Sequence, residues 1–229
     1  ALWEYLGANV YDKATGKPAL PEYWTQTFKG VTIGFIGAVT DELPSLVSPS
    51  GIADITVGDP TEAVNRVADQ LSDGKKNNGE ADIIILLVHE GAATTDISSA
   101  VDPNSRFGKI VLGANGNIDA IVSGHTHLAY NHVIDGRPVI SSGQYGERFS
   151  RMDIRYDRKS KTFTMKNEIF SLMDGSTPLF EDDPAVVPIV QEAVAVAGRL
   201  PGAVGADLGP CGIVVVAAPD EAGRGRITV

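Results

Sequence analysis

Residues 118–127 of this chain read Ile-Asp-Ala-Ile-Val-Ser-Gly-His-Thr-His, an apolar run that leads into a glycine and two histidines. Residues 120–122 are predicted to form a short buried strand, because they are apolar and include β-branched side chains. Gly124 lets the backbone turn sharply after that strand. Ligands of an open α/β sheet bind just beyond the carboxyl ends of its strands, which is where His125 and His127 fall. Two neutral imidazoles at such an edge suit a divalent metal ion.

A second apolar run ends in a similar way. Residues 83–88 read Ile-Ile-Ile-Leu-Leu-Val and are followed by His-Glu-Gly, beginning at His89. Two histidines in a turn are usually no more than a surface feature, but the chain has only four histidines. Three of them follow buried strands of the same type. We therefore predict that His89, His125 and His127 approach one another and form a shared metal site.

The segments between these strands predict a mixed α/β sheet. Residues 31–37 form a near-continuous apolar run, which is typical of a strand buried on both faces. Capping and apolar spacing predict a helix that begins at Asp59 and ends near Gly74. This helix connects residues 31–37 to the strand before His89, and such a unit implies a parallel pair with a right-handed crossover. A short helix over residues 107–112 makes a second crossover, so the two histidine-bearing strands are expected to be neighbours.

Beyond His127 the pattern becomes antiparallel, with an Asp-Gly hairpin turn followed by alternating apolar and polar residues. The expected strands cover residues 130–134, 137–141, 151–156 and 162–169. Residues 182–198 predict a helix. Residues 213–217 favour one further strand, while residues 223–226 read as a loop. The first thirty residues also read as rich in loops.

Composition limits the classes of partner. The chain has 229 residues, which allows one large domain or one domain with a piece of another. Its net charge of −10 argues against a basic nucleic-acid-binding face. Its single cysteine excludes an intrachain disulfide. No run has the length of a transmembrane helix, and the N-terminal residues do not form a signal peptide; the protein is therefore either not exported, or this chain is mature or truncated.

These residues resemble the calcineurin-like metallophosphoesterases, specifically the bacterial and ecto 5′-nucleotidase branch. The matching stretches are residues 6–10, 15–18, 30–37, 88–91, 123–127 and 142–146. The resemblance implies a mixed α/β fold. The chain would be the C-terminal half of a four-layer αββα sandwich that ends in an antiparallel region and a linker helix. Residues 1–178 would be part of a catalytic domain. Residues 179–229 would be the linker helix and a remnant of a C-terminal domain.

The resemblance also implies roles for the histidines. His89 and His125 look like ligands of one metal ion, and His127 looks like a ligand of a second. Family members use two divalent ions, such as zinc or manganese, to hydrolyse phosphate esters. The implied partner is a small nucleotide or another phosphate ester rather than a nucleic acid. The implied location is extracellular or periplasmic.

The sequence departs from the family pattern in its first half. It has no Asp-x-His motif. The Gly-Asp pair at residues 58–59 precedes proline and reads as a helix cap, and the Gly-Asn pair at residues 116–117 is followed by isoleucine instead of histidine. The bridging carboxylate, the asparagine ligand and the catalytic histidine are thus expected upstream of Ala1. No catalytic residue is assigned within the chain, and its substrate-binding residues are unknown.

Three functions remain open at this point. The first is a metal-dependent phosphohydrolase of the 5′-nucleotidase type. In that case, this chain by itself is expected to hold one metal ion or none, and to need the upstream segment for activity. The second is a non-catalytic remnant that serves only as an interaction surface. The third is a related enzyme such as a 2′,3′-cyclic-nucleotide phosphodiesterase. Glu90 either orients a histidine or is a solvated carboxylate.

Overall fold

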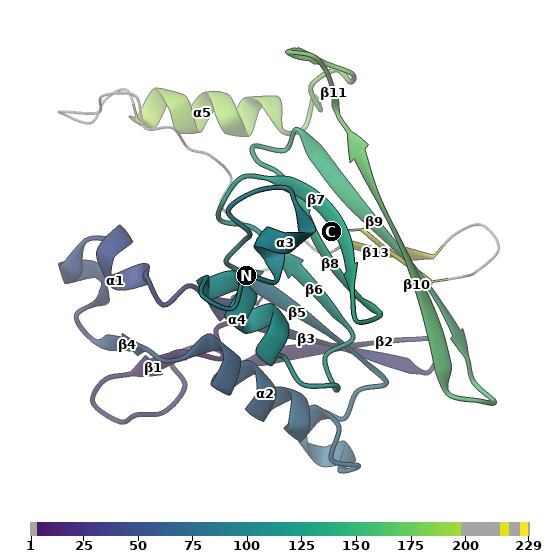
Figure 1. Cartoon of the computed structure of the whole chain (residues 1–229). Coiled ribbons are helices and arrows are strands. Elements are labelled where there is room, and N and C mark those ends of the chain that lie inside the picture. The colour runs from purple at the N-terminus through teal and green to yellow at the C-terminus, as the bar shows by residue number, and fades with distance from the viewer. Residues whose placement is uncertain (1–3, 198–215, 220–224, 229) are drawn as a thin grey trace.

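A computed structural model describes residues 4–197, 216–219 and 225–228 (Figure 1). Its centre is a six-stranded sheet with the order β2-β3-β5-β6-β8-β7. The strands are β2 (Tyr23–Phe28), β3 (Val31–Val39), β5 (Ile83–His89), β6 (Ala120–Ser123), β8 (Arg137–Ser142) and β7 (Ala129–Ile134). The four inner strands are parallel, while β2 and β7 pair antiparallel at the two edges. The predicted parallel pairing of the two histidine-bearing strands is confirmed.

Helices cover one face of this sheet (Figure 1). Helix α2 (Pro60–Leu71) begins as its sequence predicts, because the Asp59 carboxylate accepts a 2.9 Å hydrogen bond from the Glu62 backbone N–H. Its fully buried side chains, among them Val64 and Val67, recur at helical spacing and pack in one core with the central strands. Helix α4 (Arg106–Gly113) contributes to the same core.

A second sheet packs against the opposite face, with the order β10-β9-β14-β13. Its strands are β9 (Arg148–Asp157), β10 (Thr162–Ser171), β13 (Val216–Pro219) and β14 (Gly225–Thr228). Met152 of β9 is buried in one apolar cluster with Phe35 and Ile85 of the central sheet. Helices, central sheet and second sheet therefore form successive layers, and the predicted mixed α/β fold is confirmed.

The remaining elements are short or peripheral. They are β1 (Val10–Asp12), α1 (Leu43–Leu46), η1 (Pro49–Ile52), β4 (Ile55–Val57), η2 (Lys76–Asn78), α3 (Ile97–Ala100), β11 (Met173–Asp174), β12 (Thr177–Pro178) and α5 (Val187–Ala197). Among the described residues, no helix combines the length and the apolar character that crossing a bilayer requires.

Three expectations need correction. The segment expected to be rich in loops contains β2, an edge strand whose register is set by its pairing with β3. Helix α5 starts later than residue 182, because the Asp183 carboxylate accepts a 2.7 Å bond from the Ala185 N–H in a turn before it. The expected loop at residues 223–226 is wrong at Gly225 and Arg226, which lie in β14 beside β9. Residues 213–215 and Gly198 lie outside the described residues.

Candidate metal centre

The ends of two parallel strands bring two histidines together. Strands β5 and β6 are neighbours, with Val88 opposite Ser123 in the register. His89 ends the first strand, and the chain reaches His125 directly after the second. The Nδ1 atom of His125 lies 3.1 Å from the Nε2 atom of His89. The predicted meeting of these two side chains is therefore observed, across segments far apart in the sequence.

The spacing of these nitrogens is compatible with one shared metal ion. Two nitrogens that each lie about 2.0–2.1 Å from a zinc ion, with an N–Zn–N angle between about 90° and 109°, are separated by about 2.8–3.4 Å. The observed 3.1 Å falls in that interval. Burial lowers the pKa of His89, and the neighbouring His125 lowers it further. The imidazole of His89 is therefore kept in its neutral form, which is the form that binds metals.

The backbone around the pair is constrained. His125 and His127 have φ angles of 68° and 62°, in the left-handed region. Non-glycine residues held in this region cost about 1–3 kcal/mol each, and such residues cluster at functional sites. The two loops also approach closely at Gly91, where an added Cβ atom would lie 2.2 Å from the Gly124 carbonyl oxygen. A glycine is therefore needed there for the histidine-bearing loops to meet.

His127 does not join the pair. Its ring packs edge-on against Tyr145, with 5.4 Å between the ring centroids. No three His, Cys, Asp or Glu side chains in the described part of the chain are arranged to hold a metal ion. The structure thus brings together His89 and His125, the two residues that the family resemblance assigns to one ion. The role of His127 as a ligand stays a prediction.

Glu90, which follows His89, is buried. The alternative that Glu90 is a solvated carboxylate is therefore wrong. Only 5% of the residue is exposed. One carboxylate oxygen accepts a 2.8 Å hydrogen bond from the Thr40 hydroxyl, and the other accepts a 3.0 Å bond from the Gly91 N–H. Because Thr40 follows β3 and Glu90 follows β5, these bonds hold the ends of two neighbouring strands together beside the histidines.

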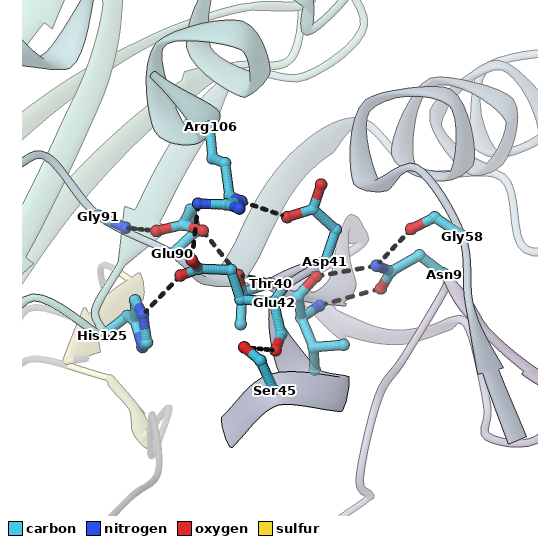
Figure 2. Close-up of polar contacts among 11 residues, drawn as sticks. Asn9, Thr40, Asp41, Glu42, Ser45, Gly58, Glu90, Gly91, Arg106 and His125 are labelled. Carbon is cyan, nitrogen blue, oxygen red and sulfur yellow. Dashed lines mark hydrogen bonds and ion pairs between the residues drawn. The ribbon is translucent and has the colours of Figure 1, made fainter. Parts of the chain in front are cut away.

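Sequence reasoning missed an ion-pair cluster beside His125, formed by Asp41, Glu42 and Arg106 (Figure 2). The guanidinium of Arg106 contacts the carboxylate of Asp41 at 2.6 Å and that of Glu42 at 2.8 Å. The other oxygen of Glu42 lies 4.0 Å from Nε2 of His125. A signal was present, since the two acidic residues follow a buried strand at the same edge of the sheet as His89. Their arginine partner lies on a different element, which local patterns do not connect to that edge.

Other polar residues near the strand ends have structural roles. Asn9 is fully buried, and its amide bonds the backbone of Val39 on one side and Gly58 on the other. Asp59 caps α2, and the Asn117 amide donates to the Asp69 carboxylate. The Gly-Asp and Gly-Asn pairs of the sequence therefore cap a helix and support a turn, as their local context predicts.

Comparisons with known proteins give relatives that are much longer than this chain. No protein-family model matches it. The endonuclease YhcR of Bacillus subtilis is 31% identical over 172 residues, which cover 74% of this chain and 13% of that protein. A 5′-nucleotidase of Vibrio cholerae is 32% identical over 126 residues, which cover 55% of this chain and 22% of that protein. The chain therefore spans less than a quarter of the length of either relative.

Among solved structures, the calcineurin-like phosphoesterase YfkN of B. subtilis has a similar fold. It superposes with a TM-score of 0.64 at 21% sequence identity, covering 86% of this chain and 63% of that chain.

Proposed function

Because the chain resembles the 5′-nucleotidase branch of the calcineurin-like metallophosphoesterases, we propose that it supplies metal ligands to a phosphohydrolase site. The proposed substrates are nucleoside 5′-monophosphates or related small phosphate esters. One observation carries the proposal, namely the 3.1 Å approach of His89 Nε2 and His125 Nδ1 at the carboxyl ends of two parallel strands. This edge of the sheet is where such folds bind their ligands.

Different residues of the chain would have different roles in such a site. His89 and His125 would hold one divalent ion through neutral imidazole nitrogens. The chemistry that such an ion would supply is polarisation of a phosphate ester and compensation of the charge that develops during hydrolysis. Thr40 and Glu90 keep the two strand ends in register, so that the imidazoles stay together in the absence of the ion. Gly91 allows the close approach of the loops.

We propose that this chain alone hydrolyses nucleotides negligibly. Neutral imidazoles carry no negative charge to offset the repulsion between two dications. In two-metal sites of this family a bridging carboxylate does so. The family's bridging carboxylate, asparagine ligand and catalytic histidine have no counterpart in the sequence. We propose that further polypeptide supplies them, and that the location is extracellular or periplasmic. We also propose that the partial catalytic domain ends at residue 178 and that residues 179–229 are a linker helix and a remnant of a C-terminal domain. This boundary is supported by α5, which contains no buried residue.

Zinc binding tests the proposal directly. Titration calorimetry of the chain with Zn²⁺ should show binding that is lost in His125→Ala. The matched control is His132→Ala, because His132 stacks on Tyr130 in β7, outside the pair. Phosphate release from AMP in the presence of Mn²⁺ should stay at background for the chain. Turnover that survives His125→Ala would show that the site has been misplaced, and equal zinc binding by all three proteins would refute the ligand assignment.

A phosphodiester substrate is a second candidate, which the 31% identity to a protein named as an endonuclease favours. The net charge of −10 makes a small diester a better partner than a long polyanion. Saturation-transfer NMR on the zinc-loaded chain can compare AMP with 2′,3′-cyclic AMP. Preferential binding of the cyclic diester would favour this candidate over the monoester.

A further inference from the structure

The two ring nitrogens of His125 face different partners. Nδ1 lies 3.1 Å from His89 Nε2. Nε2 lies 4.0 Å from a carboxylate oxygen of Glu42 (Figure 2). The second carboxylate oxygen of Glu42 is held at 2.8 Å by Arg106. A carboxylate on the far side of a metal-binding histidine is a recurrent arrangement, because it fixes the tautomer and the orientation of the ring.

The charge of Glu42 makes the two neutral tautomers of His125 unequal in energy. A neutral imidazole has one N–H donor and one acceptor nitrogen. If Nδ1 carried the proton, the lone pair on Nε2 would face the carboxylate, and the two would repel each other. If Nε2 carries it, the N–H dipole points at the carboxylate and Nδ1 presents its lone pair towards His89. The second arrangement is electrostatically favoured.

We propose that Glu42, held by Arg106, is a positioning residue that sets the Nε2–H tautomer of His125 and thereby directs the Nδ1 lone pair to the metal position shared with His89. The proposal rests on the metal site put forward above. In the metal-free protein it requires the N–H of His89 Nε2 to donate to His125 Nδ1. To bind a metal ion together with His125, His89 would have to exchange its Nε2 proton with solvent and carry its proton on Nδ1, so that both rings stay neutral.

The loop that carries Glu42 is anchored well enough for this role. The backbone N–H of Glu42 donates to the Thr40 hydroxyl at 3.2 Å, and that hydroxyl donates to the buried carboxylate of Glu90. Arg106 bonds Asp41 as well as Glu42. One guanidinium between two carboxylates leaves the cluster with one net negative charge, which is available to the imidazole N–H.

The strength of the interaction is bounded by its geometry. A separation of 4.0 Å is longer than a hydrogen bond, so the contact in this structure is electrostatic. The Glu42 side chain is 34% exposed, and water therefore screens it in part. Removing the partner of a metal-binding histidine typically lowers metal affinity about 10–100-fold. For this exposed carboxylate we expect a loss near the lower end, about 10-fold.

The tautomer can be read without any metal. Long-range ¹H–¹⁵N correlation spectra of the ¹⁵N-histidine-labelled chain, recorded at alkaline pH where imidazoles are neutral, distinguish protonated from unprotonated ring nitrogens. The signals of His125 are those absent from His125→Ala. We expect the Nε2–H tautomer in the wild type and a shift towards Nδ1–H in Glu42→Ala. The matched control is Glu168→Ala, which removes an arginine-paired carboxylate on β10 with a similar exposure of 36%.

Zinc titrations then complete the test. Glu42→Ala should lose about 10-fold in affinity, Arg106→Ala should change in the same direction, and Glu168→Ala should match the wild type. Thermal melts confirm that each variant is folded. An unchanged His125 tautomer in Glu42→Ala overturns the proposal even if zinc affinity falls, because the loss would then reflect charge alone. If the wild type binds no zinc, the proposed function fails, while the metal-free spectra still decide the role of Glu42.

Discussion

Asp119 lies at the start of β6, at the end of the sheet opposite the histidines, and its substitution tests how burial of a carboxylate affects stability. The Ile84 N–H donates a 2.8 Å hydrogen bond to this carboxylate. Burial raises the pKa of Asp119 to about 6 from the ordinary value of 3.8, against the opposing effects of that hydrogen bond and of Arg137. Asn can keep the hydrogen bond from Ile84 and carries no charge, so Asp119→Asn isolates the cost of burying the charge.

The raised pKa fixes the sign of the effect. Between about pH 4 and pH 6 the native state binds more protons at Asp119 than the unfolded state, so the free energy of unfolding falls as the pH rises. A shift of about 2 pKa units corresponds to about 3 kcal/mol at most. Because Asp119 is only half-buried and Arg137 is close, we expect about 1–2 kcal/mol. Asp119→Asn should therefore be more stable than the wild type by that amount at neutral pH, with the difference vanishing near pH 4.

Urea unfolding of both proteins at the two pH values measures this difference. Ser72→Ala is the matched control, since Ser72 lines the same polar hollow as Asp119 and carries no group that titrates in this pH range. Its effect on the free energy of unfolding should be equal at both pH values. A stability difference between Asp119→Asn and the wild type that does not change with pH, or a variant that is less stable at neutral pH, would refute the assignment of the cost to the buried charge.

Four further outcomes are expected. Zn²⁺ at one hundred times its Kd should raise the free energy of unfolding by about 2.7 kcal/mol in urea titrations, EDTA should reverse the gain, and His89→Ala should abolish it. Gly91→Ala should destabilise the fold by about 1–3 kcal/mol through overpacking, whereas Gly116→Ala, whose Cβ would meet nothing within 4 Å, should not; equal losses would contradict the close approach. Asp59→Ala should cost about 1 kcal/mol through loss of the α2 cap, measurable in the same assay, and Asn at this position should restore most of it. His127→Gly should have a higher melting temperature than His127→Ala, because both lose the ring contact with Tyr145 and only glycine relieves the backbone strain of about 1–3 kcal/mol, which outweighs its entropy cost of about 0.5–1 kcal/mol; a lower melting temperature for the glycine variant would mean that the left-handed backbone is not strained.

Local patterns predicted the parts of the fold that local forces determine. The apolar run before His89 and the capped helix at Asp59 are each specified by periodicity, burial and end signals that agree with one another. The hairpin turn at Asp135 and Gly136 is of the same kind, with φ angles of 51° and 81°. The missed elements depend on distant partners instead. Strand β2 forms by pairing with the edge of β3, and β14 joins the second sheet by pairing with β9.

The candidate site divides in the same way. Its histidines could be predicted because each follows a strand whose apolar sequence indicates burial. The carboxyl ends of neighbouring parallel strands lie at the same edge of the sheet. The contact between Glu42 and Arg106 could not, because a side-chain ion pair between a loop and a helix leaves no periodic trace. The packing of the His127 ring against Tyr145, in the turn after β6, was equally hidden, because its ring partner comes from beyond β8.

The backbone of that turn supports a functional interpretation on physical grounds. At φ angles of 68° and 62°, glycine would be free of steric cost and asparagine cheaper than most residues. Histidine supplies neither advantage, and the His125 ring is only partly buried, so packing does not compensate for the strain. What histidine does supply at these positions is a pair of ring nitrogens at the carboxyl edge of the sheet, one of them 3.1 Å from a second imidazole. A residue choice that costs stability and contributes little to the core is best explained by the chemistry of its side chain.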